Sequence, residues 1–172
     1  VTISNNTADW SGGGMHLFGS SPILTHVTIA NNTADVDGGG MFIAGSNPTL
    51  THVTISGNTV IVDWGSGGGM YLSASNPVLT NVTIAHNIVG YIGGGIYLRW
   101  NSSPEITNSI LWENYPESVY LDSGTPIITY SDIDGGWEGQ GNINADPLFT
   151  DFNNGDYTVQ EGSPCINTGH PN

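Results

Sequence analysis

Aspartates are the residues of this chain whose type and spacing best suit metal chemistry. Asp9 and Asp35 stand at the same offset in two nearly identical segments, and Asp37 and Asp63 lie in the corresponding loops. If the segments stack, equivalent carboxylates about 5 Å apart repel each other by about 0.8 kcal/mol in water and about 3 kcal/mol at an effective dielectric constant of about 20. Calcium would relieve this repulsion through carboxylate and carbonyl oxygens, and so would solvation. Both interpretations stay open, and neither makes a cofactor a requirement.

A second acidic motif is the stretch DFNNGDY, which contains Asp151, Asn153 and Asp156. Its oxygen-bearing side chains are those of a short calcium loop. It lacks the terminal Glu and the regular spacing of an EF-hand. A tight turn is therefore the favoured interpretation, and a calcium loop is the weaker one.

Ring side chains form another pattern that could serve binding. They occupy the same position in successive segments: His16, Phe42, Tyr71, Tyr97 and Tyr120. On stacked strands they would form a stripe roughly 20 Å long. Strand propensity and stacking between rings could place them there, and the alternative is a contact surface for sugar rings or for another copy of the protein. Three tryptophans in or near the flanking loops would widen such a surface: Trp10, Trp64 and Trp100.

Catalysis is not expected from these residues. Hydrolysis by paired carboxylates needs two acids about 5–9.5 Å apart, and the outward ring positions offer none. Arg99 is the only basic side chain apart from histidine. Four glycine triplets look like phosphate cradles, but they precede strands rather than helices and no Lys follows them. Their expected role is steric, because glycine permits positive φ and close stacking of the backbone.

The elements that would position these residues come from a sequence repeat. Equivalent segments start at six positions: Val1, Val27, Val53, Val82, Ser109 and Ser131. The steps between them are 26, 26, 29, 27 and 22 residues, and the length variation falls between an asparagine pair and the glycines. Each repeat contains three short stretches with period-two alternation, which is typical of strands. The repeat predicts an all-β, right-handed parallel β-helix of about five coils, stacked about 4.8 Å apart.

Inward positions of the three strands predict hydrophobic ladders along the helix axis. Their members are Met15, Met41, Met70, Ile96 and Val119; Leu17, Ile43, Leu72, Leu98 and Leu121; Leu24, Leu50, Leu79, Ile106 and Ile128; and Ile3, Ile29, Ile55 and Ile84. Residues 1–130 are expected to form the repeats. Residues 131–172 break the pattern and are expected to cap the last coil, as solenoids require. The expected lid residues are Trp137, Leu148, Phe149, Tyr157, Val159 and Ile166.

Composition restricts the partners. The chain has 15 acidic residues, one basic residue and a net charge of -14, which argues against nucleic acid because phosphate contacts need Lys or Arg. No apolar run approaches the roughly 18 residues of a membrane span.

Cys165 has no second cysteine to pair with, so we expect a small buried apolar residue there. The chain shows no signal peptide and lacks a starting Met, so we expect a processed chain or a piece of a longer one.

Four glycosylation sequons occur, at Asn5, Asn31, Asn81 and Asn101. An Asn-rich and Ser/Thr-rich chain of this length yields about that many by chance, so they predict no glycosylation.

The repeats resemble the pectate-lyase-like right-handed parallel β-helix repeats of secreted bacterial and archaeal proteins. The ending GGWEGQGNINADPLFTD…NGDYTVQEGSPCIN is similar to the closing segment of many large surface or secreted proteins of that group. The resemblance implies an extracellular or cell-surface location. Lyases of the group use an Arg or Lys base with a calcium-binding acidic cluster, and hydrolases use several Asp with G-H-G and R-I-K motifs; neither set is present.

These observations together predict a non-catalytic extracellular structural or adhesive β-helix module, which could self-assemble into a surface layer or filament. A carbohydrate-binding module that uses the ring positions is the first alternative. A relative of the polysaccharide lyases and hydrolases is the second. Regular outward threonine columns also suit ice binding, but β-branched residues are common in any strand. The expected partners are other copies of the protein or glycans.

Overall fold

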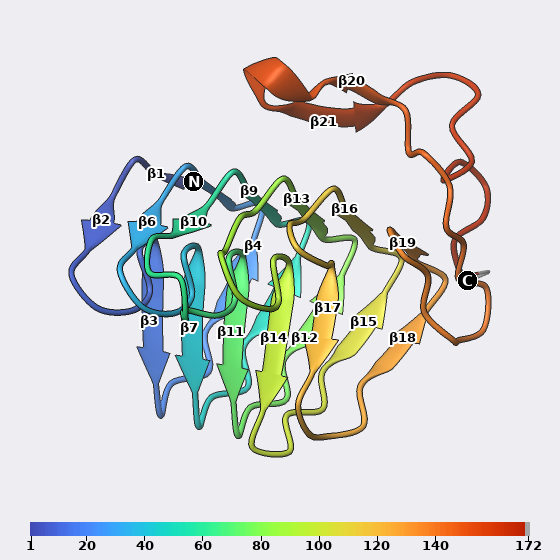
Figure 1. The fold of residues 1–172 in the computed structure, drawn as a ribbon. Helices are drawn as coiled ribbons and strands as arrows, with labels where there is room; N and C mark the ends of the chain where they lie inside the picture. Colours follow the sequence, from blue (N-terminus) through green and yellow to red (C-terminus); the bar gives the residue numbers. More distant parts are fainter. Residues whose placement is uncertain (171–172) are drawn as a thin grey trace.

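The computed structural model describes residues 1–170, and their strands wind into a parallel β-helix (Figure 1). The first sheet contains β1 (Thr2–Ser4), β5 (Thr28–Ala30), β9 (Thr54–Ser56), β13 (Thr83–Ala85), β16 (Ile110–Trp112) and β19 (Asp132–Ile133). The second contains β3 (Met15–Phe18), β7 (Met41–Ala44), β11 (Met70–Ser73), β14 (Ile96–Arg99) and β17 (Val119–Leu121). The third contains β4 (Ile23–Thr25), β8 (Thr49–Thr51), β12 (Val78–Thr80), β15 (Glu105–Thr107) and β18 (Ile127–Thr129). The three predicted strands per coil are therefore confirmed.

A fourth, short sheet was not expected from the sequence. It consists of β2 (Thr7–Ala8), β6 (Thr33–Ala34) and β10 (Thr59–Val60), in the segment interpreted as a loop. Ala34 and Val60 are buried there, so this part of each coil also contributes to the core before the chain leaves for the surface. The variable loop is consequently shorter than predicted and begins after these strands.

The hydrophobic ladders are confirmed by the strand register. Met41 pairs with Met15 on one side and Met70 on the other, and Ile43 pairs with Leu72 in the same strands. Members in the central coils are fully buried, whereas Met15 is half-buried and Leu121 is 40% exposed because β3 and β17 are the edge strands of their sheet. Since each buried aliphatic side chain contributes about 1.5–3 kcal/mol, the central coils hold most of the stabilisation.

A ladder of asparagines, buried from the second coil onward, joins the coils at one corner, and the sequence did not predict it. The members follow the Val-Thr-Ile strands: Asn6, Asn32, Asn58, Asn87 and Asn114. The Asn32 side-chain amide donates to Asn58 Oδ1 (3.1 Å) and to the carbonyl of Ile3 (3.0 Å), and its backbone N–H donates to the same Asn58 oxygen (2.9 Å). Each side chain thus satisfies a backbone N–H and a backbone carbonyl of the preceding coil, which a corner without strand pairing would otherwise leave unpaired.

The glycine triplets have the steric role predicted for them. Gly67 has φ +70°, and a Cβ there would lie 2.9 Å from the Cα of Tyr71. A Cβ on Gly39 would lie 2.5 Å from the carbonyl oxygen of Gly68 in the next coil. Larger residues would therefore push the coils apart, and no helix follows the triplets to form an anion site.

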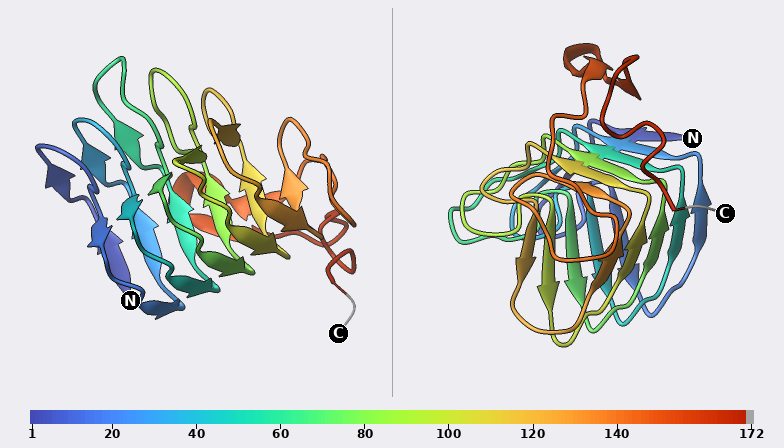
Figure 2. Two further views of the ribbon diagram at one scale, coloured as in Figure 1. Left: turned by 90° about the horizontal axis from the view of Figure 1, so that it is seen from below. Right: turned by 90° about the vertical axis from the view of Figure 1, so that its right-hand side faces the viewer.

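The C-terminal segment closes the helix differently from the prediction. Trp137 packs against the core at the end of the last coil, as expected. The hairpin β20 (Phe149–Asp151) and β21 (Asp156–Val159), joined by the 3-10 turn η1 (Phe152–Asn154), lies along the outside of the helix (Figures 1 and 2). The expectation that Leu148, Phe149 and Tyr157 cover the end of the core is therefore wrong. The hairpin instead covers β9 and β13, where Ser56 and Ala85 face outward and are buried.

The described residues contain no helix long and apolar enough to cross a membrane.

Candidate functional site

The predicted ring column runs unbroken along the outer face of the second sheet. From His16 through Phe42, Tyr71 and Tyr97 to Tyr120, successive ring centroids lie 4.7, 5.0, 5.1 and 5.8 Å apart. The strand register pairs each ring residue with the next. The repeat alone was sufficient to predict this geometry, because equal offsets in stacked coils place side chains above one another.

Two rings in the middle of the column are closed to solvent, which the sequence did not reveal. Tyr71 is 6% exposed and Tyr97 is 7% exposed. Rings stack on both sides of each, and the glycine turn of the same coil lies over the strand: a Cβ on Gly93 would be 2.7 Å from the Tyr97 Cβ. His16 and Tyr120, at the two ends, are exposed. A role as a contact surface stays a prediction, and the middle rings offer a ligand little area.

Arg99 lies beside the column on the same face of β14. Its Nη1 donates to the Tyr71 hydroxyl at 3.3 Å, and its guanidinium lies 5.3 Å from the Trp100 ring centroid. Burial, followed by the charge of Asp122, raises the pKa of Tyr97 to about 12, and burial also raises the pKa of Tyr71. Both phenols keep their protons at neutral pH, so this cluster has no phenolate to act as a base.

Two of the aspartates proposed for calcium share a column, as predicted. Ala8 pairs with Ala34, and the Asp35 N–H donates to the Ala8 carbonyl at 3.0 Å, so Asp9 and Asp35 follow in register. In the third coil the equivalent position is Ile61, whose N–H donates to the Ala34 carbonyl at 3.0 Å. The carboxylate column therefore has only these two members.

The other two aspartates lie elsewhere. Asp37 stands between Ser11 and Ser66 in a separate column, and its Oδ1 accepts the Ser66 N–H at 3.0 Å. Asp63 is exposed on the longer loop of the third coil, beside Gly90. Within residues 1–170, no three His, Cys, Asp or Glu side chains group closely enough to hold a metal ion. Calcium binding at Asp9, Asp35, Asp37 and Asp63 stays a prediction.

The DFNNGDY stretch forms the turn of the β20–β21 hairpin, which was the favoured interpretation. Asp151 Oδ2 accepts the Asn154 side-chain amide at 2.7 Å. Asp156 Oδ1 accepts the Thr158 hydroxyl at 2.6 Å and its backbone N–H at 3.0 Å, and these bonds lower the pKa of Asp156. Both carboxylates are therefore engaged within the turn itself.

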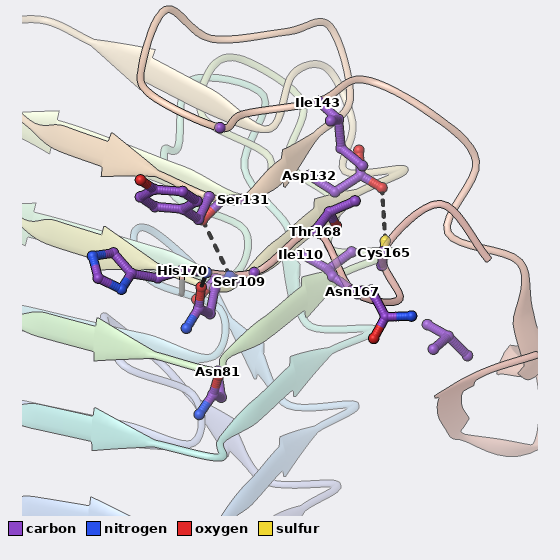
Figure 3. A pocket seen from close by; sticks show the side chains of 15 residues that line it. Asn81, Ser109, Ile110, Ser131, Asp132, Ile143, Cys165, Asn167, Thr168 and His170 are labelled. Carbon is purple, nitrogen blue, oxygen red and sulfur yellow. Dashed lines mark hydrogen bonds between the residues drawn. The ribbon is translucent and has the colours of Figure 1, made fainter. Parts of the chain in front are cut away.

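A cavity of about 530 Å³ lies between the last coils and the chain's final segment (Figure 3). Inside it, the Cys165 thiol donates to Asp132 Oδ2 at 3.1 Å, and Asp132 Oδ1 accepts the Ala145 N–H at 3.1 Å. Burial and this hydrogen bond raise the pKa of Cys165 to about 12, and burial raises the pKa of Asp132. The pair was missed because Cys165 was expected to be buried and apolar; it is half-buried and has a polar partner.

A second cavity, of about 260 Å³, opens between β16 and the hairpin. Trp112, Glu113 and Asp146 line it together with hairpin residues. Next to it, His86 Nε2 lies 2.7 Å from Glu113 Oε2, and the imidazole stacks on Phe152 with centroids 4.5 Å apart. No sequence signal pointed here, because the hairpin lies outside the repeat and its docking site is set by side-chain packing.

The comparisons with known proteins agree with this architecture. A family model described as the right-handed β-helix region matches residues 1–146. Comparison with curated proteins and with solved structures gave no match. The matched range extends beyond residue 130, and β19 joins the first sheet there. The proposed division at that residue stays a prediction.

Proposed function

The chain belongs to the right-handed β-helix family, and we propose that it is a non-catalytic structural and adhesive module of an extracellular or cell-surface protein. One observation carries the proposal: two columns of side chains, one of asparagines and one of rings, join each coil to its neighbours. The asparagine ladder and the ring column both run along the helix axis. Such columns hold coils together, which is what a rigid spacer requires.

The nucleophiles and bases offer further support. Cys165, with its pKa raised to about 12, carries almost no thiolate at neutral pH, and the thiolate is the reactive form. Arg99 contacts a phenol and an indole rather than a pair of carboxylates. These contacts support a structural rather than a catalytic role for Cys165 and Arg99.

An activity screen tests the non-catalytic part of the proposal. The protein is incubated with acidic and neutral polysaccharides, with calcium present, and new reducing ends and unsaturated uronates are measured. We expect no product above the buffer blank. Cleavage by the protein that disappears in Arg99→Ala would overturn the proposal and identify a polysaccharide-active enzyme.

Self-association is proposed to use the first coil. Among the described residues its strands β1, β2, β3 and β4 lie at the edges of their sheets, and an edge strand that no other segment of the protein covers readily pairs with another chain. Ile23, on β4, is 78% exposed, so Ile23→Lys should keep the fold and block edge pairing. Sedimentation over a concentration series should show oligomers that Ile23→Lys removes. Monomers at every concentration would contradict this contact.

Calcium is not required by the proposed function. Asp37 already accepts a backbone N–H, and Asp63 lies in a different column from Asp9 and Asp35. We therefore expect the melting temperature to be the same in a chelator and in calcium at matched ionic strength. A rise in melting temperature with calcium that Asp9→Asn plus Asp35→Asn removes would establish a structural ion.

A further inference from the structure

The loops that follow the short fourth sheet project from one edge of the helix in a row (Figure 2). These loops, together with the positions of the fourth and fifth coils that continue the column of Thr59 in β10, carry six large apolar side chains, each between 50% and 70% exposed. We name this surface the loop ridge, and its members are Trp10, Ile61, Trp64, Ile88, Tyr91 and Tyr115. Single exposed apolar residues are ordinary, but a row of them marks an interaction site.

The ridge is ordered by the coils beneath it. Thr59, Ile88 and Tyr115 are bridged in parallel from coil to coil, and the Val36 N–H donates to the Trp10 carbonyl at 2.8 Å. Exposed members come from the first, third, fourth and fifth coils, so the ridge is roughly 20 Å long at a coil spacing of about 4.8 Å. Its side chains are therefore presented on an ordered base, with a gap at the second coil, where Val36 is buried.

Carboxylates are interleaved with the apolar groups. Asp9 and Asp35 occupy the column that Ile61 continues, and Asp63 precedes Trp64 at the loop tip. The ridge has no basic side chain. The chain's single arginine, Arg99, lies on β14 with its guanidinium against Tyr71 and Trp100. The surface is both aromatic and acidic.

The charge of the loop ridge indicates which class of partner can bind there. A second copy docked ridge to ridge would bring its own Asp9, Asp35 and Asp63 against the same carboxylates, so this face is not the one proposed for self-association. Anionic lipid and nucleic acid are disfavoured for the same reason. We propose that the loop ridge docks a Lys/Arg-rich segment of another protein that also carries apolar side chains. Its cations would pair with the aspartates and stack on the indole and phenol rings, and its apolar groups would cover the exposed ridge. The proposal adds a partner to the adhesive role and does not depend on self-association.

Two labelled peptides of equal length and charge test the proposal: one alternates arginine with leucine, and the other alternates arginine with serine. Fluorescence anisotropy measures their binding to the whole chain. We expect the leucine peptide to bind about tenfold or more tightly, as apolar anchors contribute most at interfaces. Its binding should persist at about 0.5 M salt, where exposed charge pairs are largely screened. Equal affinities would overturn the proposal.

Matched variants locate the binding. Trp10→Ala plus Trp64→Ala, and separately Asp9→Asn, Asp35→Asn plus Asp63→Asn, should each weaken the leucine peptide by about tenfold. The aromatic control is Phe18→Ala plus Trp100→Ala, which removes two exposed rings outside the ridge. The charge control removes three exposed acids elsewhere: Glu105→Gln, Asp122→Asn and Glu138→Gln.

The control variants distinguish binding at the loop ridge from non-specific attraction to the net charge of the protein. Both control sets should keep affinity within about twofold, while circular dichroism confirms that every variant is folded. Equal weakening by ridge and control variants would show attraction to net charge alone and would overturn the proposal. Displacement of the peptide by a neutral oligosaccharide, with the same dependence on Trp10 and Trp64, would assign the ridge to glycans and would also overturn it.

Discussion

At the scale of single residues, a ring in the middle of a stacked column behaves as a core residue although its side chain points outward. Tyr97 is 7% exposed and lies between Tyr71 and Tyr120. Its position could be predicted from the repeat, because equal offsets place rings in one column. Its burial could not be predicted, because the glycine turn that covers β14 follows a loop whose length differs from repeat to repeat. Position follows from periodicity, whereas exposure depends on the path of the neighbouring loop.

Tyr97→Ala should therefore reduce stability. Removing a buried aromatic side chain costs about 3–5 kcal/mol, while Tyr97→Phe keeps the stack and should cost about 1 kcal/mol or less. Denaturant unfolding of both variants measures the difference. If Tyr97→Ala kept full stability and abolished glycan retention, the column would be a ligand surface instead.

Asp37 provides a second test at this scale. Burial raises the pKa of its carboxyl above the ordinary 3.8, while the Ser66 N–H acts in the opposite direction more weakly. A raised pKa in the folded state means that the ionised carboxylate destabilises the fold at neutral pH, and that this penalty disappears as the pH falls toward 3.8.

Asp37→Asn, which keeps an oxygen for the Ser66 N–H, should therefore stabilise the protein at pH 7 and lose that advantage near the ordinary carboxyl pKa of 3.8. Melting temperatures across this pH range measure the effect. Asp63→Asn removes the same charge from an exposed position and serves as the control. A gain for Asp37→Asn that stayed constant down to this pH would show that burial of the charge is not its cause.

At the scale of elements, the buried asparagines do for this corner what strand pairing does for the sheets. Asn58 Oδ1 accepts two hydrogen bonds from Asn32, and its amide donates to the carbonyl of Ile29 at 3.0 Å. The sequence shows an asparagine pair in the first two coils only, because Gly57, His86 and Glu113 precede the later ladder members. Which asparagines turn inward depends on the path of the chain from the first sheet to the short fourth sheet, and that sheet was not predicted.

Asn58→Ala should cost about 2–5 kcal/mol, because it leaves several buried backbone and amide groups unpaired at about 1–3 kcal/mol each. Asn47→Ala removes an exposed asparagine that accepts one hydrogen bond from Asn76 and should cost about 1 kcal/mol or less. Chemical denaturation compares the two variants. Equal costs would mean that the ladder adds nothing beyond an ordinary surface hydrogen bond.

At the scale of the whole molecule, each coil is stabilised by its two neighbours, so position along the axis matters as much as residue type. Met41 lies between Met15 and Met70 and is fully buried, whereas Met15 is half-buried on the edge strand β3. The repeat predicted the winding and the ladders well, because stacking is a nearest-neighbour rule. It could not predict where the hairpin β20–β21 docks, since that contact uses non-repeating residues such as Phe152 and Tyr157.

The same substitution should therefore lower the free energy of unfolding by different amounts at different positions along the helix axis. Met41→Ala leaves a cavity between two coils and should cost about 2–5 kcal/mol. Met15→Ala should cost about half as much or less, because half-exposed atoms lose less transfer free energy. Parallel denaturation curves measure both, and equal losses would contradict nearest-neighbour stabilisation.

The third coil is three residues longer than the two before it, a step of 29 against 26, yet Met70 still lies directly over Met41. The three extra residues lie beyond the fourth sheet, around Trp64, so they do not shift the pairing of the strands in the other sheets. A change of loop length at this point therefore leaves the register of the strands unchanged. A foreign peptide grafted in place of Asp63 and Trp64 would inherit the same tolerance, so this edge is suited to the display of new sequences.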